Sequence, residues 1–154
     1  HGLARFTGVS YKTFTQENSD LVHDHIGALL WDENSKSLWV GTYEGLCQFK
    51  RGKWMEQRDK SSLGELSHTR VFNLELHKKP EDPESSGLWV AYRGGAAFAQ
   101  PSISGKGYQF QSFTVANTDG GIPSRFVHDI ISGSDEGVYF MTLEGVVKAW
   151  YSKD

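Results

Sequence analysis

The sequence predicts an all-β fold of β-propeller-type repeats, with about three four-stranded antiparallel blades per chain. Three observations lead to this fold class. A nine-residue pattern occurs three times at intervals of fifty residues, and short apolar runs alternate with turn residues. No segment shows a sustained apolar period of 3.6 residues, so less than about a tenth of the chain is expected to be helical. The best weak helix candidate is Ser61–His68.

The repeated pattern joins an apolar, aromatic strand to a glycine turn. Leu38–Leu46 reads LWVGTYEGL, Leu88–Ala96 reads LWVAYRGGA, and Val138–Val146 reads VYFMTLEGV. Ahead of each copy, two apolar residues stand five positions apart. These pairs are Leu21 and Ile26, Leu66 and Val71, and Ile122 and Val127. Two features that recur together in each copy define one structural unit.

Each unit is expected to form four short strands, a to d. In the first full unit, strand a spans Ile26–Trp31, strand b Ser37–Thr42, strand c Leu46–Lys50 and strand d Lys53–Gln57. The turn between b and c contains a glycine in every copy, and we expect a positive φ there. These glycines are Gly45, Gly95 and Gly145.

The units divide a single domain, 1–154, into a partial blade at 1–20, full units at about 21–65 and 66–120, and a partial unit at 121–154. A β-sandwich or a β-solenoid is the alternative architecture. Four strands in about fifty residues favour the propeller, because a sandwich need not repeat.

Composition excludes several classes of protein. The net charge of −3 and scattered basic residues argue against nucleic-acid binding. No apolar run approaches the ~18 residues of a membrane span, so no membrane contact is expected. No signal peptide is visible. Cys47 is the only cysteine, so an intramolecular disulfide is excluded and the cellular compartment is left open.

The segment Leu29–Leu46, LLWDENSKSLWVGTYEGL, closely resembles the two-component regulator propeller repeat. The second unit departs from that pattern at Ala91 and Tyr92, and the third at Tyr139 and Met141. The resemblance implies the sensing part of a bacterial hybrid histidine kinase, located outside the cytoplasm. It also implies that a whole propeller recognises a ligand such as a glycan.

Aromatic residues recur at one position of strand b: Trp39, Trp89 and Tyr139. We expect them to pack between neighbouring blades rather than to stack on a ligand. Cys47 lies in expected strand c and is interpreted as a small buried apolar residue rather than a reactive thiolate.

Histidines and an aspartate near the starts of the units raise the question of a metal site: His23, Asp24, His25, His68 and His128. Ser124 replaces histidine in the third unit, and the spacing of a zinc motif is missing, so no metal and no other cofactor is predicted. Nucleophile, phosphate-loop and zinc-protease motifs are also missing, so the chain is not expected to be an enzyme. A lyase or hydrolase acting on glycans is the least favoured of the functions considered.

A ligand is expected on the loop face around the channel, where the d–a and b–c loops emerge. Glycans, other polar small molecules and peptides suit its mixed polar and aromatic character. The candidate binding residues are His23, Asp24, His25, Tyr43, Glu44, His68, Arg70, Tyr92, Arg93, Arg125 and Glu144.

Strand counting predicts the assembly. The N-terminus offers strands c and d, and the C-terminal unit lacks strand d, which leaves unpaired edges. A homodimer could complete a six-bladed propeller by lending Tyr11–Thr15 to the partner's last blade. The alternative is that the chain is a fragment of a longer propeller. A purely structural role in protein–protein interaction is the second function considered.

Overall fold

The computed structural model describes residues 1–56, 69–78, 86–103, 107–133 and 137–150. These residues form β-strands and connecting turns without any helix, and the helix candidate Ser61–His68 lies outside the described residues. The strands are β1 (Leu3–Phe6), β2 (Tyr11–Phe14), β3 (Ile26–Asp32), β4 (Ser37–Thr42), β5 (Gly45–Lys50), β6 (Lys53–Glu56), β7 (Val71–His77), β8 (Gly87–Tyr92), β9 (Gly95–Pro101), β10 (Tyr108–Phe113), β11 (Val127–Ser132), β12 (Gly137–Thr142) and β13 (Gly145–Trp150).

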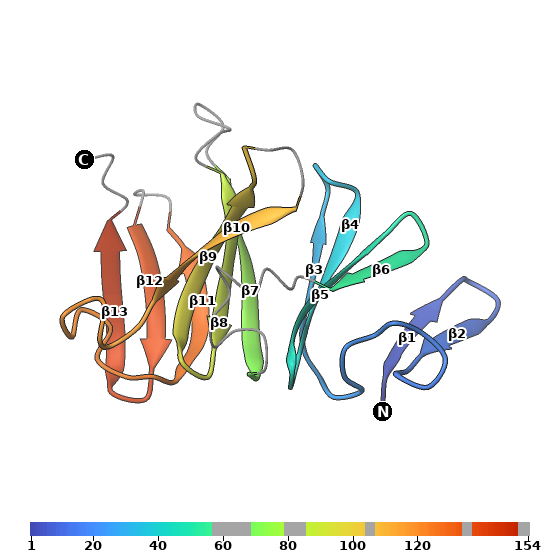
Figure 1. The fold of residues 1–154 in the computed structure, drawn as a ribbon, viewed down its shortest axis with the longest axis horizontal. Coiled ribbons are helices and arrows are strands. Elements are labelled where there is room, and N and C mark those ends of the chain that lie inside the picture. Colours follow the sequence, from blue (N-terminus) through green and yellow to red (C-terminus); the bar gives the residue numbers. More distant parts are fainter. Residues whose placement is uncertain (57–68, 79–85, 104–106, 134–136, 151–154) are drawn as a thin grey trace.

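The thirteen strands form four antiparallel sheets that follow one another along the chain. The first sheet pairs β1 with β2, and two four-stranded sheets follow, β3–β6 and β7–β10. The last sheet contains β11, β12 and β13. Figure 1 shows these sheets side by side from the N-terminal to the C-terminal end. Each sheet is built from neighbours in sequence, as the turn signals predicted.

The turn between the second and third strand of a unit is held in the same way in two units. The hydroxyl of Thr42 donates to the carbonyl oxygen of Gly45 at 2.9 Å and accepts the N–H of Glu44 at 3.1 Å. Thr142 repeats both bonds at the same distances. The glycines of the three turns, Gly45, Gly95 and Gly145, have φ values of 120°, 150° and 122°. The predicted positive φ is therefore confirmed.

Large aromatic side chains fill the space between adjacent sheets. Trp39 is 1% exposed and packs against residues of β7 and β8, with the ring of Tyr108 edge-on at 4.8 Å. Trp89 packs in the same way against the β11–β13 sheet, where Phe140 lies 5.2 Å away. The expected packing between blades is confirmed for both tryptophans. Tyr139 is half-buried on the outer side of the last sheet.

Apolar side chains are exposed toward both ends of the row of sheets. On the β11–β13 sheet, Ile131, Met141 and Val146 are 57%, 47% and 70% exposed. The equivalent surfaces of the β3–β6 and β7–β10 sheets are covered by the next sheet. At the other end, Leu29 and Trp31 of β3 are also exposed. The β1–β2 hairpin covers only part of that face, where it helps to bury Val40 and Cys47.

The first strands of the three larger sheets lie next to one another, β3 against β7 and β7 against β11. Each carries a β-bulge near its start, which leaves Gly27, Phe72 and His128 out of register with the neighbouring strand. The rings of Phe72 and His128 are 4.7 Å apart. Equivalent positions of adjacent units therefore meet at the starts of the inner strands.

Candidate functional site

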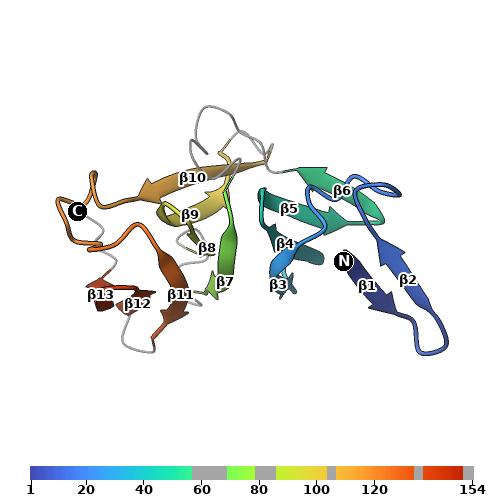
Figure 2. The same cartoon turned by 90° about the horizontal axis from the view of Figure 1, so that it is seen from below.

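The b–c turns and the described parts of the d–a loops emerge at one edge of the sheets. This edge is at the bottom of Figure 1 and faces the viewer in Figure 2. Backbone hydrogen bonds tie the turns after β4 and β8 to the loops before inner strands. Within a unit, the N–H of Tyr43 donates to the carbonyl of His25 at 3.0 Å. Between units, the N–H of Gly94 donates to the carbonyl of Arg125 at 2.7 Å. The loops of adjacent units thus form one surface, which we call the loop face.

A chain of aromatic rings and cations runs across this face through all three larger units. It begins at the N-terminus, where the rings of His1 and His25 are 4.6 Å apart. His23 stacks parallel to Tyr43, with 6.1 Å between ring centres. The guanidinium of Arg70 then lies 4.0 Å from the centre of the Tyr43 ring and 4.9 Å from that of Phe72.

The same chain continues into the third unit. Phe72 contacts His128, which stacks on Phe126 with ring centres 6.4 Å apart. Two guanidinium groups flank the Phe126 ring, Arg93 at 5.7 Å and Arg125 at 5.8 Å. Ring and cation contacts of this kind hold side chains in place while leaving faces for a ligand to stack on. We call this set the aromatic–cationic arc: His1, His23, His25, Tyr43, Arg70, Phe72, Phe126, His128, Arg93 and Arg125.

Two polar atoms near the arc are buried without a hydrogen bond to any described residue. They are Nε2 of His128 and the side-chain oxygen of Asn73. Both belong to the starts of inner strands, β11 and β7 respectively. Buried polar atoms usually have partners, and those left over commonly mark sites for water or a ligand. The inner side of the arc therefore has unused hydrogen-bonding capacity.

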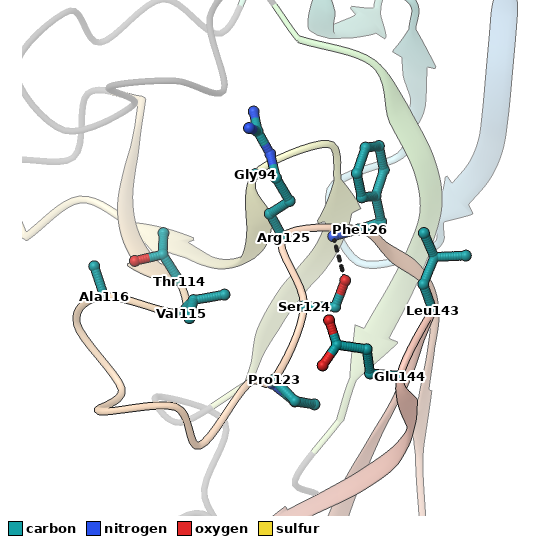
Figure 3. A pocket seen from close by; sticks show the side chains of 10 residues that line it. All are labelled: Gly94, Thr114, Val115, Ala116, Pro123, Ser124, Arg125, Phe126, Leu143 and Glu144. Atoms are coloured by element: carbon teal, nitrogen blue, oxygen red, sulfur yellow. Dashed lines mark hydrogen bonds between the residues drawn. The ribbon is translucent and has the colours of Figure 1, made fainter.

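A pocket of about 650 Å³ lies beside the arc, between the second and third units. Its walls come from three segments of the loop face: the turn after β8, the loop from β10 to β11, and the turn after β12. Figure 3 shows its lining residues, Gly94, Thr114, Val115, Ala116, Pro123, Ser124, Arg125, Phe126, Leu143 and Glu144. The volume lies within the range of small-molecule sites.

A second cavity of about 340 Å³ opens at the other end of the sheets, near the turn after β3. It is lined by Asp32, Trp39 and His77 among others. The carboxylate of Asp32 is occupied there, since it accepts hydrogen bonds from the Asn34 N–H and the Ser35 hydroxyl. This cavity is lined by groups that hold a turn, and we do not place the site there.

The structure brings most of the sequence-predicted site residues onto the loop face. His23, His25, Tyr43, Arg70, Arg93 and Arg125 are members of the arc. Glu44 lies 4.0 Å from the His23 ring, and Glu144 lines the pocket. Asp24 also lies at this face, where its carboxylate accepts the N–H of Gln16 at 2.7 Å.

Two predicted site residues stand apart from the rest. Tyr92 is 1% exposed and packs in the core between sheets, so its side chain does not reach the loop face. His68 lies outside the described residues. Among the described residues, no three histidine, cysteine, aspartate or glutamate side chains gather closely enough to hold a metal ion.

Sequence reasoning did not single out the rings of Phe72 and Phe126 as site residues, and it considered His128 only as a metal ligand. A signal was present, because Phe72 and His128 each follow directly the second residue of an apolar pair. That position is the bulge, which turns its side chain out of the strand's regular alternation.

The chain matches no family model and no curated protein. It is similar to two crystal structures of the extracellular domain of BT4673 from B. thetaiotaomicron, described in one case as a hybrid two-component system and in the other as a one-component system. Sequence identity is 14% for both, with TM-scores of 0.53 and 0.50. The similarity covers 99% of this chain but only 25% of each neighbour.

In the part of the chain that the structure describes, no helix is long and apolar enough to cross a membrane. At 14% identity the two neighbours establish the fold and nothing finer. The repeats, the thirteen strands and this similarity agree with one another. The chain has an all-β fold of propeller type, with about three four-stranded antiparallel blades.

Proposed function

We propose that this chain is a non-catalytic, ligand-binding part of a sensory propeller that works outside the cytoplasm. The aromatic–cationic arc carries the proposal, because it joins the loops of three units into one surface. A ligand that contacts several loops at once can change how the units sit against one another. The two structural neighbours are extracellular domains of signalling systems, which supports a sensing role.

Charge and shape favour a polar ligand with at least one anionic group. The arc contains Arg70, Arg93 and Arg125, all exposed. Acidic side chains on the same face include Asp24, Glu44 and Glu144. Guanidinium groups bind carboxylates, sulfates and phosphates through paired hydrogen bonds. The rings between them offer stacking faces for a planar group or a sugar. Glycans with acidic groups and other polar small molecules fit this description.

A ligand screen tests the proposal directly. The purified chain is heated with a library of polar small molecules, both charged and neutral, and a specific ligand raises the melting temperature. A variant with Arg70→Ala, Arg93→Ala and Arg125→Ala should lose that increase. The matched control removes three cations elsewhere, with Arg5→Ala, Lys12→Ala and Lys53→Ala, and should keep it. A ligand that shifts both variants equally would place the site somewhere else.

A second function is favoured by the apolar side chains exposed toward both ends of the row of sheets. We propose as the alternative that the four sheets act as one domain that assembles into a larger propeller. In the homodimer form of this proposal, six blades are completed by two chains. One complication is structural: β2 is already paired with β1 over its whole length. A partner strand for β13 would therefore come from the other edge of β2, from a rearranged hairpin, or from other repeats of a longer chain.

Light scattering separates these possibilities. A stable monomer of about 17 kDa contradicts the dimer. A dimer that dissociates when Met141→Glu and Val146→Lys are introduced would support assembly through the end sheet. A dimer that persists both in this variant and after deletion of residues 1–16 would contradict blade sharing.

A further inference from the structure

The pocket beside the arc holds one cation and one anion that do not neutralise each other. Arg125 comes from the loop before β11 and Glu144 from the turn after β12. Both side chains are exposed. Among the described residues, no ion pair of 4.0 Å or less joins these two side chains. Figure 3 shows the guanidinium of Arg125 and the carboxylate of Glu144 at opposite ends of the lining.

Much of the remaining lining is apolar. Val115, Pro123, Phe126 and Leu143 contribute hydrocarbon and aromatic surface to the pocket. Leu143 is 66% exposed, so its side chain is available for contact with a ligand. An apolar ligand body would gain hydrophobic free energy by covering these side chains.

The polar groups at the base of the pocket already make hydrogen bonds within the chain. The Ser124 hydroxyl is buried and accepts the N–H of Phe126 at 3.3 Å. The N–H of Gly94 is also used, because it donates to the carbonyl of Arg125. Ligand groups would therefore meet two charged side chains at the ends and few free polar groups between them. A sugar, which needs hydrogen bonds along its whole length, is poorly matched to such a surface.

From this arrangement we infer that the pocket binds a short apolar peptide, such as a dipeptide, by its two charged ends. This inference rests on the proposed ligand-binding function and names a ligand class for one part of the loop face. The peptide carboxylate pairs with Arg125, the ammonium group pairs with Glu144, and the apolar side chains lie on Phe126 and Leu143. Because the two charges are held apart, a dipeptide suits the pocket better than a single amino acid.

The test compares four ligands by isothermal titration calorimetry with the complete chain. Leucyl-leucine carries both charges, N-acetyl-leucyl-leucine lacks the ammonium, leucyl-leucinamide lacks the carboxylate, and leucine is shorter. Leucyl-leucine should bind best, and removal of either charge should weaken binding by about tenfold, as expected for a lost charge-assisted hydrogen bond.

Two variants assign each charge to its partner. Glu144→Gln should abolish the preference for leucyl-leucine over its N-acetyl form and leave the preference over the amide unchanged. Arg125→Gln should do the reverse. The control Arg5→Ala should leave all four affinities unchanged. Both substitutions are at exposed positions, and unchanged melting temperatures would show that the variants fold.

The outcomes distinguish the inference from the proposed function. Equal affinity for all four ligands, or variants that weaken all of them equally, would overturn the peptide inference. So would the absence of peptide binding while the polar library still yields ligands that need the arc arginines, and in that case the sensory proposal stands. If neither peptides nor any library member binds, both proposals fail.

Discussion

The guanidinium of Arg70 lies 4.0 Å from the centre of the Tyr43 ring and so joins the first full unit to the second. At the next junction the equivalent positions are Arg93, which follows β8, and Phe126, which precedes β11. There the guanidinium is 5.7 Å from the ring. The cation and the ring have exchanged places between the two junctions, while the contact between them is kept. Such an exchange indicates that the cation–ring contact itself stabilises the junction between the two units.

Exchanging the residues of the first junction tests this interpretation. The double variant Tyr43→Arg with Arg70→Tyr should be more stable than the sum of its two single variants predicts, by about 0.5–1 kcal/mol. The single variants place two cations or two rings together and lose the contact. Urea unfolding of the four proteins gives the coupling free energy. A coupling near zero would mean that the two residues are merely close.

Replacing the buried tryptophan between the first two full units should be costly. Trp39→Ala removes a side chain that is 1% exposed, and a loss of about 3–5 kcal/mol is expected. Trp31→Ala is the matched control, because Trp31 lies on the neighbouring strand but is 53% exposed. Its loss should be below about 1 kcal/mol. Equal losses in chemical denaturation would contradict the assignment of Trp39 to the core between sheets.

Two turn glycines with similar backbone conformations should respond differently to alanine. At Gly95 a Cβ would lie 2.1 Å from the carbonyl oxygen of Phe113, whereas at Gly145 no atom lies within 4 Å. Both positions have a strained φ for alanine, which costs about 1 kcal/mol. Gly95→Ala should lose at least about 1 kcal/mol more than Gly145→Ala, because the backbone must shift. Thermal unfolding of the two variants measures the difference, and similar melting temperatures would refute it.

Cys47 should make stability depend on pH in the alkaline range. Burial raises the pKa of its thiol from 9.0 to about 11. Between these values the unfolded chain loses the proton and the folded chain keeps it, so stability falls as the pH rises from about 9 to about 11. The loss is at most about 1.4 kcal/mol per pH unit. Comparison with Cys47→Ala isolates this contribution, since the other titrating groups are common to both proteins. Parallel stability curves would contradict it.

The strands and turns could be predicted from the sequence because residues close in sequence determine them. Strand b was predicted at Ser37–Thr42 and is found at those bounds, because turn residues flank it on both sides. Chain order alone places each strand beside its predecessor in these sheets. The glycine conformations followed from turn geometry in the same way.

The candidate site could be predicted only in part from the sequence, because it depends on contacts between residues of different units. Tyr92 was predicted for the loop face, but it is the last residue of strand β8. Thr42 and Thr142 occupy the equivalent position in the other units, and all three side chains are buried. Side chains alternate between the faces of a strand, so an error of one residue separates the core from the surface. Comparison with the two threonines could have revealed this. The contact between Phe72 and His128 arises from adjacent bulges, which composition and periodicity do not reveal.

In a regular strand, one residue both keeps the ladder in register and presents its side chain. The bulges at the starts of β3, β7 and β11 separate these two roles. A residue left out of the ladder can change without shifting the pairs on either side of it. Phe72 and His128 can therefore be exchanged for other side chains during evolution while the sheet keeps its register. Gly27 is the exception, because a Cβ there would lie 2.1 Å from the carbonyl oxygen of Val71. Related chains could thus recognise different molecules through substitutions at two positions, with the third kept small by its neighbour.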